Sequence, residues 1–173
     1  MWSTDLQREE NYNEYLRLKQ SSDYLDVTYD EESGGVSAVH KFHKFDKQKG
    51  SMSIRRGDYE RTVIEVLRKQ GHRIVLEEET NMPGVKSYDG YLDDLPMEIK
   101  AVEGIGTWSI STKLRNAGKQ QAKCVVLFFP EKSLYSPFRI TEGIRLVNSS
   151  PDKEVISELS RILVVVEDHI EAI

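Results

Sequence analysis

The chain is 173 residues long and 38% hydrophobic, which supports one compact domain and is too short for two domains of ordinary size. It has no apolar run of about 18 residues and begins without the charged and apolar regions of an export signal. We therefore expect no membrane partner and a cytoplasmic site of action, in the producing cell or in a target cell. The single cysteine, Cys124, excludes an internal disulfide.

The formal net charge of −5 hides a blocked distribution of charge along the chain. Residues 1–35 carry nine acids and three bases, 41–73 ten bases and four acids, 77–103 eight acids and two bases, and 104–145 seven bases and two acids. Basic blocks therefore flank an acidic one, as expected where cations hold a phosphate backbone around a carboxylate-rich metal centre. Ordinary solvated faces would explain the same pattern.

The first part of the chain predicts little regular structure. Residues 1–35 are acidic and tyrosine-rich and end in a glycine-containing loop sequence, which predicts an arm or linker. Tyr12, Tyr15 and Leu16 are spaced as on one side of a helix, so a short helix could dock there on the domain or on a partner. Residues 36–56 form a basic, histidine-containing segment, and the folded domain is expected over residues 57–173.

The body of the chain predicts alternating helices and strands, as in α/β folds. Val63, Ile64 and Leu67 repeat at helical spacing, which indicates a helix with Asp58 as its cap and Gly71 just past its end. The later elements expected are a strand over 72–78, a turn over 81–84, hairpin arms over 87–92 and 96–102, a helix over 109–123, strands over 124–129 and 138–147, a helix from Pro151 and a closing strand over 162–166.

Hairpin geometry predicts that two carboxylates and a lysine come together. If Asp93 and Asp94 form a two-residue turn, Asp89 lies directly opposite Glu98. Strand alternation then places Lys100 on the same face as Glu98, while Met97, Ile99 and Ala101 point the other way into the core. A longer turn would change this register.

Two inward-facing carboxylates are costly unless a cation neutralises them, which predicts a divalent metal ion. Mg²⁺ or Mn²⁺ prefers oxygen ligands, here Asp89, Glu98 and the Ile99 carbonyl, and Zn²⁺ is a further option. Lys100 would orient the attacking water or stabilise charge on the phosphate. Glu60, in the first turn of the predicted helix, completes this catalytic and metal-binding set. The alternative explanation for Glu60 is a favourable interaction with the helix dipole.

The order of helix, strand, hairpin, helix and strand, with Glu60, Asp89 and the run Glu98-Ile99-Lys100 in place, resembles the αβββαβ core of PD-(D/E)XK nucleases. This resemblance implies a restriction-endonuclease-like α/β fold with a mixed central sheet. The stretch from Lys113 to Gln120, followed by an apolar strand, further resembles the C-terminal toxin domains of CdiA-type contact-dependent inhibition proteins. Several of those domains are tRNA nucleases.

The resemblance covers about residues 57–130 and has consequences for substrate and partner. It implies that Lys113 and Gln120, a seven-residue step apart, face the active site and bind the substrate. It also implies an immunity protein as partner. One departure is that no proline precedes Asp89, although the family motif is named for one.

His40 and His43 lie three residues apart in the basic segment and are candidates for contact with the substrate. Stacking of bases on Phe42 or Phe45, with phosphate contact by the neighbouring lysines, would suit RNA. Two histidines without a third or a cysteine nearby are too few for a structural zinc site. A surface segment or a lid whose rings pack on the core explains the same residues.

These features predict a metal-dependent endonuclease acting on nucleic acid, with RNA, and tRNA in particular, favoured over DNA by the resemblance. It would act as a toxin or effector domain. The alternatives are a DNA endonuclease of a mobile element or phage, a metal-independent ribonuclease of the barnase, EndoU, colicin or RelE type that uses His40 or His43 with Lys100 and Thr112, and a non-catalytic binding module. EDTA separates the two enzyme classes, because it abolishes cleavage only where a metal is needed.

Overall fold

The computed structural model describes residues 4–80, 82–83 and 88–173, so the turn expected over 81–84 and the hairpin start expected at residue 87 fall partly or wholly outside it. The helices are α1 (Asp5–Gln20), α2 (Arg56–Lys69), α3 (Ser109–Lys119) and α4 (Pro137–Asn148), with 3₁₀ helices η1 (Lys132–Leu134) and η2 (Pro151–Ile156). The strands are β1 (Tyr24–Tyr29), β2 (Val36–His40), β3 (Arg73–Leu76), β4 (Gly90–Leu92), β5 (Leu95–Ala101), β6 (Cys124–Phe129), β7 (Arg161–Val166) and β8 (His169–Glu171).

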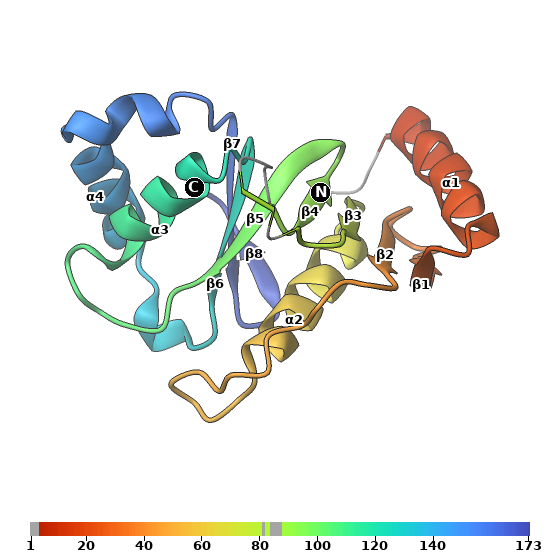
Figure 1. Cartoon of the computed structure of the whole chain (residues 1–173), viewed down its shortest axis with the longest axis horizontal. Coiled ribbons are helices and arrows are strands. Elements are labelled where there is room, and N and C mark those ends of the chain that lie inside the picture. The colour runs from red at the N-terminus through yellow and green to blue at the C-terminus, as the bar shows by residue number, and fades with distance from the viewer. Residues whose placement is uncertain (1–3, 81, 84–87) are drawn as a thin grey trace.

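Within the described residues, eight strands form one sheet in chain order, from β1 at one edge to β8 at the other (Figure 1). β2 pairs with β3, β5 with β6 and β6 with β7 in parallel, and the other neighbours are antiparallel. The elements from α2 to β6 follow one another in αβββαβ order. The expected α/β class and mixed central sheet are confirmed.

Helices cover both faces of the sheet. Val63 and Leu67 of α2 belong to a buried cluster on one face. Leu114 of α3 packs with α4 on the opposite face, over the β5–β7 end. Leu18 of α1 packs against Val75 of β3. The neighbours of Val75 in β3 pack with α2, so by strand alternation Val75 and α1 lie on the face opposite to α2. Among the described residues, no helix is long and apolar enough to span a bilayer.

The hairpin β4–β5 has the tight turn that the sequence predicts. Asp93 and Asp94 have φ values of 48° and 68°, as a two-residue turn with both central residues left-handed requires. A Cβ atom on Gly90 would lie 2.0 Å from the Val75 carbonyl oxygen, so a glycine is needed for β4 to approach β3. β4 begins at Gly90 whereas β5 continues to Ala101, which leaves a notch in the sheet beside the second half of β5.

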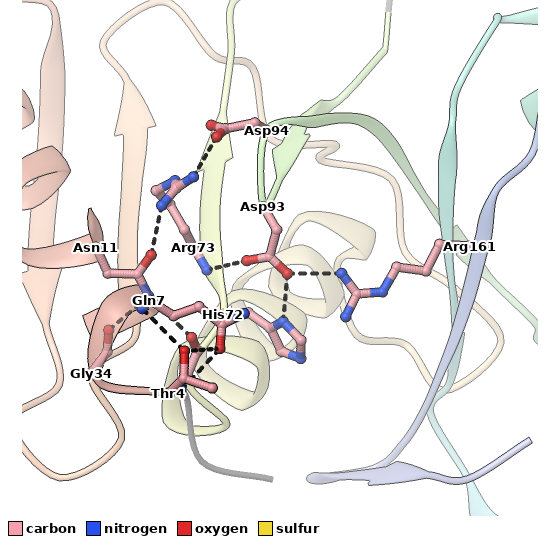
Figure 2. A network of polar contacts seen from close by, with 10 residues as sticks. Thr4, Gln7, Asn11, Gly34, His72, Arg73, Asp93, Asp94 and Arg161 are labelled. Carbon is pink, nitrogen blue, oxygen red and sulfur yellow. Dashed lines mark hydrogen bonds and ion pairs between the residues drawn. The ribbon is translucent and has the colours of Figure 1, made fainter. Parts of the chain in front are cut away.

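The described part of the acidic N-terminal segment belongs to the sheet and is not a separate arm or linker. β1 pairs with β2, and both lie in the same sheet as the later strands, so the sheet begins well before the boundary expected at Gly57. Asn11 of α1 is buried and donates to the carbonyls of Gly34 and Gly71, and it accepts from Arg73 (Figure 2). The polar composition misleads because few positions of α1 are buried.

Two local predictions are wrong near the C-terminus. The strand expected over 138–147 is helix α4, because Ser136 caps it by accepting from the Arg139 amide and Pro137 suits its first turn. The helix expected from Pro151 is the short 3₁₀ helix η2. The strand expected over 162–166 is confirmed as β7.

Two helix ends also differ from the prediction. Asp58 lies in the first turn of α2, but the cap residue is Arg55, which makes no capping hydrogen bond through its side chain. The helix expected over 109–123 ends at Lys119, because Gln121 takes a left-handed φ of 63° and the chain turns into β6. The helix expected after Gly57 and the strand expected after Gly71 are confirmed as α2 and β3.

Candidate active site

Asp89 and Glu98 meet at the notch in the sheet. The ladder pairs Gly90 with Met97, so the next pair along the hairpin is Asp89 with Glu98, as the sequence predicts. The Asp89 amide donates to Glu98 Oε1 at 3.1 Å, and the Ile99 amide donates to Asp89 Oδ2 at 2.6 Å. Glu98 is only 2% exposed. Two carboxylates therefore share one enclosed place where β4 has ended and β5 continues.

Lys100 lies directly beside this pair. Its Nζ is 2.7 Å from Glu98 Oε2 and donates to Gln120 Oε1 at 2.8 Å. Gln120 is the cap residue at the C-terminal end of α3. Met97 is fully buried on the α2 side, as strand alternation requires when Glu98 and Lys100 face α3. The structure thus brings together Glu98, Lys100 and Gln120, all three of which the sequence singles out.

The surroundings of the two carboxyl groups disfavour two negative charges. Burial and the neighbouring charge of Glu98 raise the pKa of Asp89, although the Ile99 amide opposes this. Burial also raises the pKa of Glu98, and the ion pair with Lys100 only partly offsets it. Among the described residues, one ammonium group, that of Lys100, forms an ion pair with these two acids. A further cation between Asp89 and Glu98 would stabilise both ionised forms.

Glu60 reaches the site from α2 and is held by a buried histidine. His43 Nε2 lies 3.2 Å from Glu60 Oε1, and His43 Nδ1 lies 2.7 Å from the Glu77 carbonyl oxygen. A carbonyl oxygen only accepts, so Nδ1 carries a hydrogen, and Nε2 needs a second hydrogen to bond an ionised Glu60. Burial lowers the pKa of His43, but the hydrogen bonds to Glu60 and to the Glu77 carbonyl, together with the charges of Glu60 and Glu79, outweigh this, and the pKa is raised.

This geometry changes the expected role of His43. The side chain is fully enclosed, and both ring nitrogens are engaged. The structure therefore places His43 beneath the surface as an anchor for Glu60, away from the solvent-facing position that contact with a substrate requires.

A cavity of about 430 Å³ opens beside the carboxylate pair, and Glu60, Asp89 and Ile99 are among the residues that line it. The Ile99 amide faces Asp89, and because the amide and carbonyl of a strand residue point to the same edge, its carbonyl also faces the notch. In the part of the chain that the structure describes, no group of three or more His, Cys, Asp or Glu side chains forms a complete metal site. The oxygens that could hold a cation are those of Asp89 and Glu98 and the Ile99 carbonyl, with Glu60 across the cavity.

Lys113 of α3 adds a positive charge near Lys100. Burial and the charge of Lys100 lower the pKa of Lys113, the charge of Glu103 opposes this, and the charge of Arg56 lowers it further. Arg56 is held by Glu103 at 2.8 Å, whereas Lys113 makes no hydrogen bond or ion pair with any other described residue. A half-buried lysine that forms no ion pair with a described residue is suited to bind an anion such as a phosphate group.

His40 lies outside the carboxylate site, at the end of β2. Its ring packs edge-on against Tyr24, with centroids 5.4 Å apart, and its Nδ1 accepts from the Phe42 amide at 3.1 Å. The structure thus separates the two histidines that the sequence groups together.

Two acidic residues near the site have no distinguishing pattern in the sequence. Glu103 accepts from the Ser51 amide at 2.5 Å and pairs with Arg56, which ties the loop before α2 to the end of β5. Glu77 holds His43 through its carbonyl, and its amide donates to the Asp89 carbonyl at 2.9 Å. Both act on groups distant in sequence, so only the acidic character of residues 77–103 hints at them.

A second carboxylate cluster lies at the other end of the hairpin (Figure 2). Asp93 Oδ2 accepts from His72 Nδ1 and from Arg161 Nη1, each at 2.8 Å, and its Oδ1 accepts from the Arg73 amide at 2.9 Å. Burial alone would raise the pKa of Asp93, but these donors lower it to about 2. The hydrogen-bond donors to the Asp93 carboxylate all come from the protein, so we assign Asp93 a role in stabilising the fold.

Comparisons with known proteins support the fold. No family model and no curated protein matches the chain. A chain of the solved CdiA-CT/CdiI toxin and immunity complex from Burkholderia pseudomallei is similar, with a TM-score of 0.55 and 21% sequence identity. The match covers 79% of this chain and 98% of that one. At this level of identity, the likeness establishes a shared fold.

Proposed function

We propose that this chain is a metal-dependent nuclease that hydrolyses phosphodiester bonds, acts on RNA in preference to DNA, and serves as a toxin domain of the contact-dependent inhibition type. The observation that carries the proposal is the buried Asp89–Glu98 pair with Lys100 beside it. The Asp93 carboxylate accepts from three donors. Among the described residues, the Asp89–Glu98 pair has one ion-paired ammonium group for two acids. Such an arrangement is costly to stability and is typical of functional sites.

The donor set fits Mg²⁺ or Mn²⁺. Both ions favour oxygen ligands, and the notch offers two carboxylates and one backbone carbonyl, with space for water in the adjoining cavity. Zn²⁺ fits less well, because the nearest histidine, His43, already uses both ring nitrogens. When bound, the ion would supply an activated water and neutralise charge on the phosphate.

The remaining roles follow from the positions of the side chains. Asp89 and Glu98 would hold the ion, and Glu60, held in place by His43, would contribute a further carboxylate to it directly or through water. Lys100, oriented by Gln120, would place its ammonium group against the scissile phosphate and stabilise the negative charge that builds there. Lys113 would bind a phosphate of the backbone.

The choice of substrate and partner rests on likeness. The similar solved chain comes from a toxin and immunity complex, and toxin domains resembling residues 113–127 of this chain are in several cases tRNA nucleases. This favours RNA, tRNA in particular, as the substrate, the cytoplasm of a target cell as the site of action, and an immunity protein as the partner.

Incubation of the purified chain with tRNA and with duplex DNA, in the presence of Mg²⁺ or Mn²⁺, tests the proposal. We expect cleavage of tRNA that EDTA abolishes and that Glu98→Gln and Lys100→Ala each reduce by about a thousandfold or more. Asp168→Asn is the matched control, because this carboxylate is 93% exposed at the surface and should leave cleavage unchanged.

Three outcomes would contradict the proposal in different ways. Cleavage that persists in EDTA would favour a metal-independent ribonuclease. Cleavage of duplex DNA with intact tRNA would reverse the substrate. No cleavage of either nucleic acid with any of Mg²⁺, Mn²⁺ or Zn²⁺ would favour a binding module.

A further inference from the structure

A row of three aromatic rings lies on the surface next to the carboxylate site. The Tyr24 and His40 ring centroids are 5.4 Å apart, and those of His40 and Phe42 are 5.6 Å apart. Phe42 is 56% exposed, which is unusual for a phenylalanine that has neighbouring rings to pack against. We call Tyr24, His40 and Phe42 the aromatic ledge.

Glu77 connects the ledge to the proposed catalytic carboxylates. Tyr24 Oη donates to Glu77 Oε1 at 2.7 Å, and the Glu77 amide donates to the Asp89 carbonyl at 2.9 Å. Phe42 also directly precedes His43, which holds Glu60. The ledge is therefore joined to the site through Glu77, whose side chain contacts Tyr24 and whose amide contacts Asp89.

The ledge and its border offer the groups that bind a nucleotide. His40 Nδ1 accepts from the Phe42 amide, so the hydrogen of the neutral ring lies on Nε2, and no described residue accepts it. Lys44 is exposed and lines the cavity without an ion pair to any described residue. Lys41 lies over the Phe42 ring at 5.2 Å from its centroid, but Asp23 already binds it at 2.7 Å. An exposed ring, an imidazole donor and an exposed lysine thus lie within the five residues 40–44.

We propose that the aromatic ledge binds an unpaired nucleobase of the substrate, stacked on Phe42, with Lys44 on the adjoining phosphate. This inference rests on the proposed nuclease function and refines it. Bases inside a duplex are stacked on one another and cannot lie on a protein ring, so the ledge selects single strands, loops or bulges. The site would then cut next to an unpaired nucleotide.

A polyanion suits the ledge better than an apolar protein partner does. The segment 41–61, which contains Phe42, carries seven basic and three acidic side chains. Other large exposed apolar side chains lie in the loop before α3, as Ile105 and Trp108 do, and in α4, as Phe138 does. Charge complementarity therefore favours nucleic acid at Phe42.

Binding of a short single-stranded RNA to the Glu98→Gln protein tests the inference without cleavage. We expect Phe42→Ala to weaken binding roughly tenfold and Phe42→Trp to retain it, because an indole also stacks. Binding of the same sequence as a duplex should be weaker and insensitive to Phe42→Ala. Phe138→Ala is the matched control, since that ring is 73% exposed on α4, and it should change neither affinity.

Abasic substitutions locate the base that stacks. Removing one base at a time should weaken binding roughly tenfold at a single position, and at that position Phe42→Ala should cause no additional loss. Equal affinity of Phe42→Ala and the parent for every RNA would overturn the inference, as would equal losses with Phe138→Ala.

Cleavage of the same RNA by the unaltered chain with Mg²⁺ separates this inference from the function beneath it. If the chain cleaves the RNA and Phe42→Ala binds it as tightly as the parent, the proposal for the aromatic ledge is wrong and the nuclease proposal stands. Absence of both cleavage and binding overturns the nuclease proposal, and the ledge with it.

Discussion

The two ends of the β4–β5 hairpin carry the same kind of residue in opposite electrostatic situations. Asp93 at the turn accepts from His72, Arg161 and a backbone amide, and these donors lower its pKa to about 2. Among the described residues, the carboxylate of Asp89 at the open end accepts one hydrogen bond, from the Ile99 amide. A second acid lies beside it, and its pKa is raised. About 13 Å of strand separates the two, at the usual rise per residue.

The difference teaches how to separate a structural from a functional carboxylate in one fold. A carboxylate that lowers the energy of the folded protein is surrounded by donors, as Asp93 is. A carboxylate pair that raises the energy of the folded protein persists only where something outside the chain offsets that cost. In our proposal, a metal ion offsets it. Neutralising Asp93 should therefore lower stability and leave activity nearly unchanged. Neutralising Asp89 should lower activity and leave stability unchanged or raised.

The largest expected effect is on catalysis. Asp89→Asn should reduce cleavage by about a thousandfold or more, because it removes a proposed metal ligand. The same substitution should raise, or at least not lower, the melting temperature of the metal-free protein, because it removes the repulsion with Glu98. Cleavage assays and thermal denaturation in EDTA measure the two effects. A protein that loses stability together with activity would mean that Asp89 is structural.

Substitution at the turn should have the opposite profile. Asp93→Ala leaves His72 and Arg161 without their acceptor, and we expect a loss of about 2–3 kcal/mol in the free energy of unfolding. Well below its melting temperature, the variant should cleave at nearly the parental rate. Urea denaturation and cleavage at low temperature check this. Strong loss of cleavage in a variant that remains folded would mean that Asp93 and Asp89 belong to one functional site.

A smaller effect is expected for the half-buried cation. Lys113→Ala should raise KM roughly tenfold and leave kcat nearly unchanged, because a phosphate contact away from the reacting atoms binds ground state and transition state alike. Stability should not fall, since Lys113 has no ion pair with a described residue and its burial disfavours its charge. Steady-state kinetics separate the two constants. A fall in kcat at constant KM would place Lys113 at the scissile phosphate.

The smallest effect is in the pH dependence of stability. The pKa of Asp93 is about 2 in the folded protein, below its ordinary value of about 3.9, so its contribution is present above about pH 4 and is lost as the pH falls toward 2. The pKa of Asp89 is raised, so its ionisation costs stability as the pH rises above the ordinary aspartate range. Thermal denaturation in EDTA should show stability falling both below about pH 4 and as the pH rises above the ordinary aspartate range. Asp93→Asn should remove the loss at low pH, and Asp89→Asn should remove the loss at higher pH.

Mg²⁺ should sharpen the comparison further. Added Mg²⁺ should raise the melting temperature most at the higher pH, where Asp89 is ionised and free to bind it. The rise should vanish in Asp89→Asn and persist in Asp93→Asn. A stabilisation by Mg²⁺ that is the same in both variants would place the ion elsewhere.

The central hairpin was predictable because its geometry is local. Asp93 and Asp94 tolerate the left-handed backbone that a two-residue turn needs, and a tight turn sets every pair in both arms. The facing of Asp89 and Glu98, and the position of Lys100 on the same face, follow from that turn and from strand alternation. The helix after Gly57 was predictable for a similar reason, since its apolar residues repeat within a few turns.

The errors occur where nearby residues do not decide the outcome. The polar segment before residue 36 gains its order from β2 and from Asn11, which binds groups far along the chain. The segment 138–147 has apolar residues that suit a strand or a helix, and the cap at Ser136 decides between them. Periodicity alone cannot resolve either case.

The sequence by itself determined the α/β class, the hairpin register and the facing of two acids with a lysine, because turn chemistry and strand alternation act between residues that are close in the chain. Only the tertiary structure decided that His43 anchors Glu60, that Gln120 holds Lys100, and that Asp93 is satisfied while Asp89 is not. Those contacts join segments that folding brings together from far apart, and the burial and hydrogen bonds that set their charges exist only once the sheet and its helices have packed.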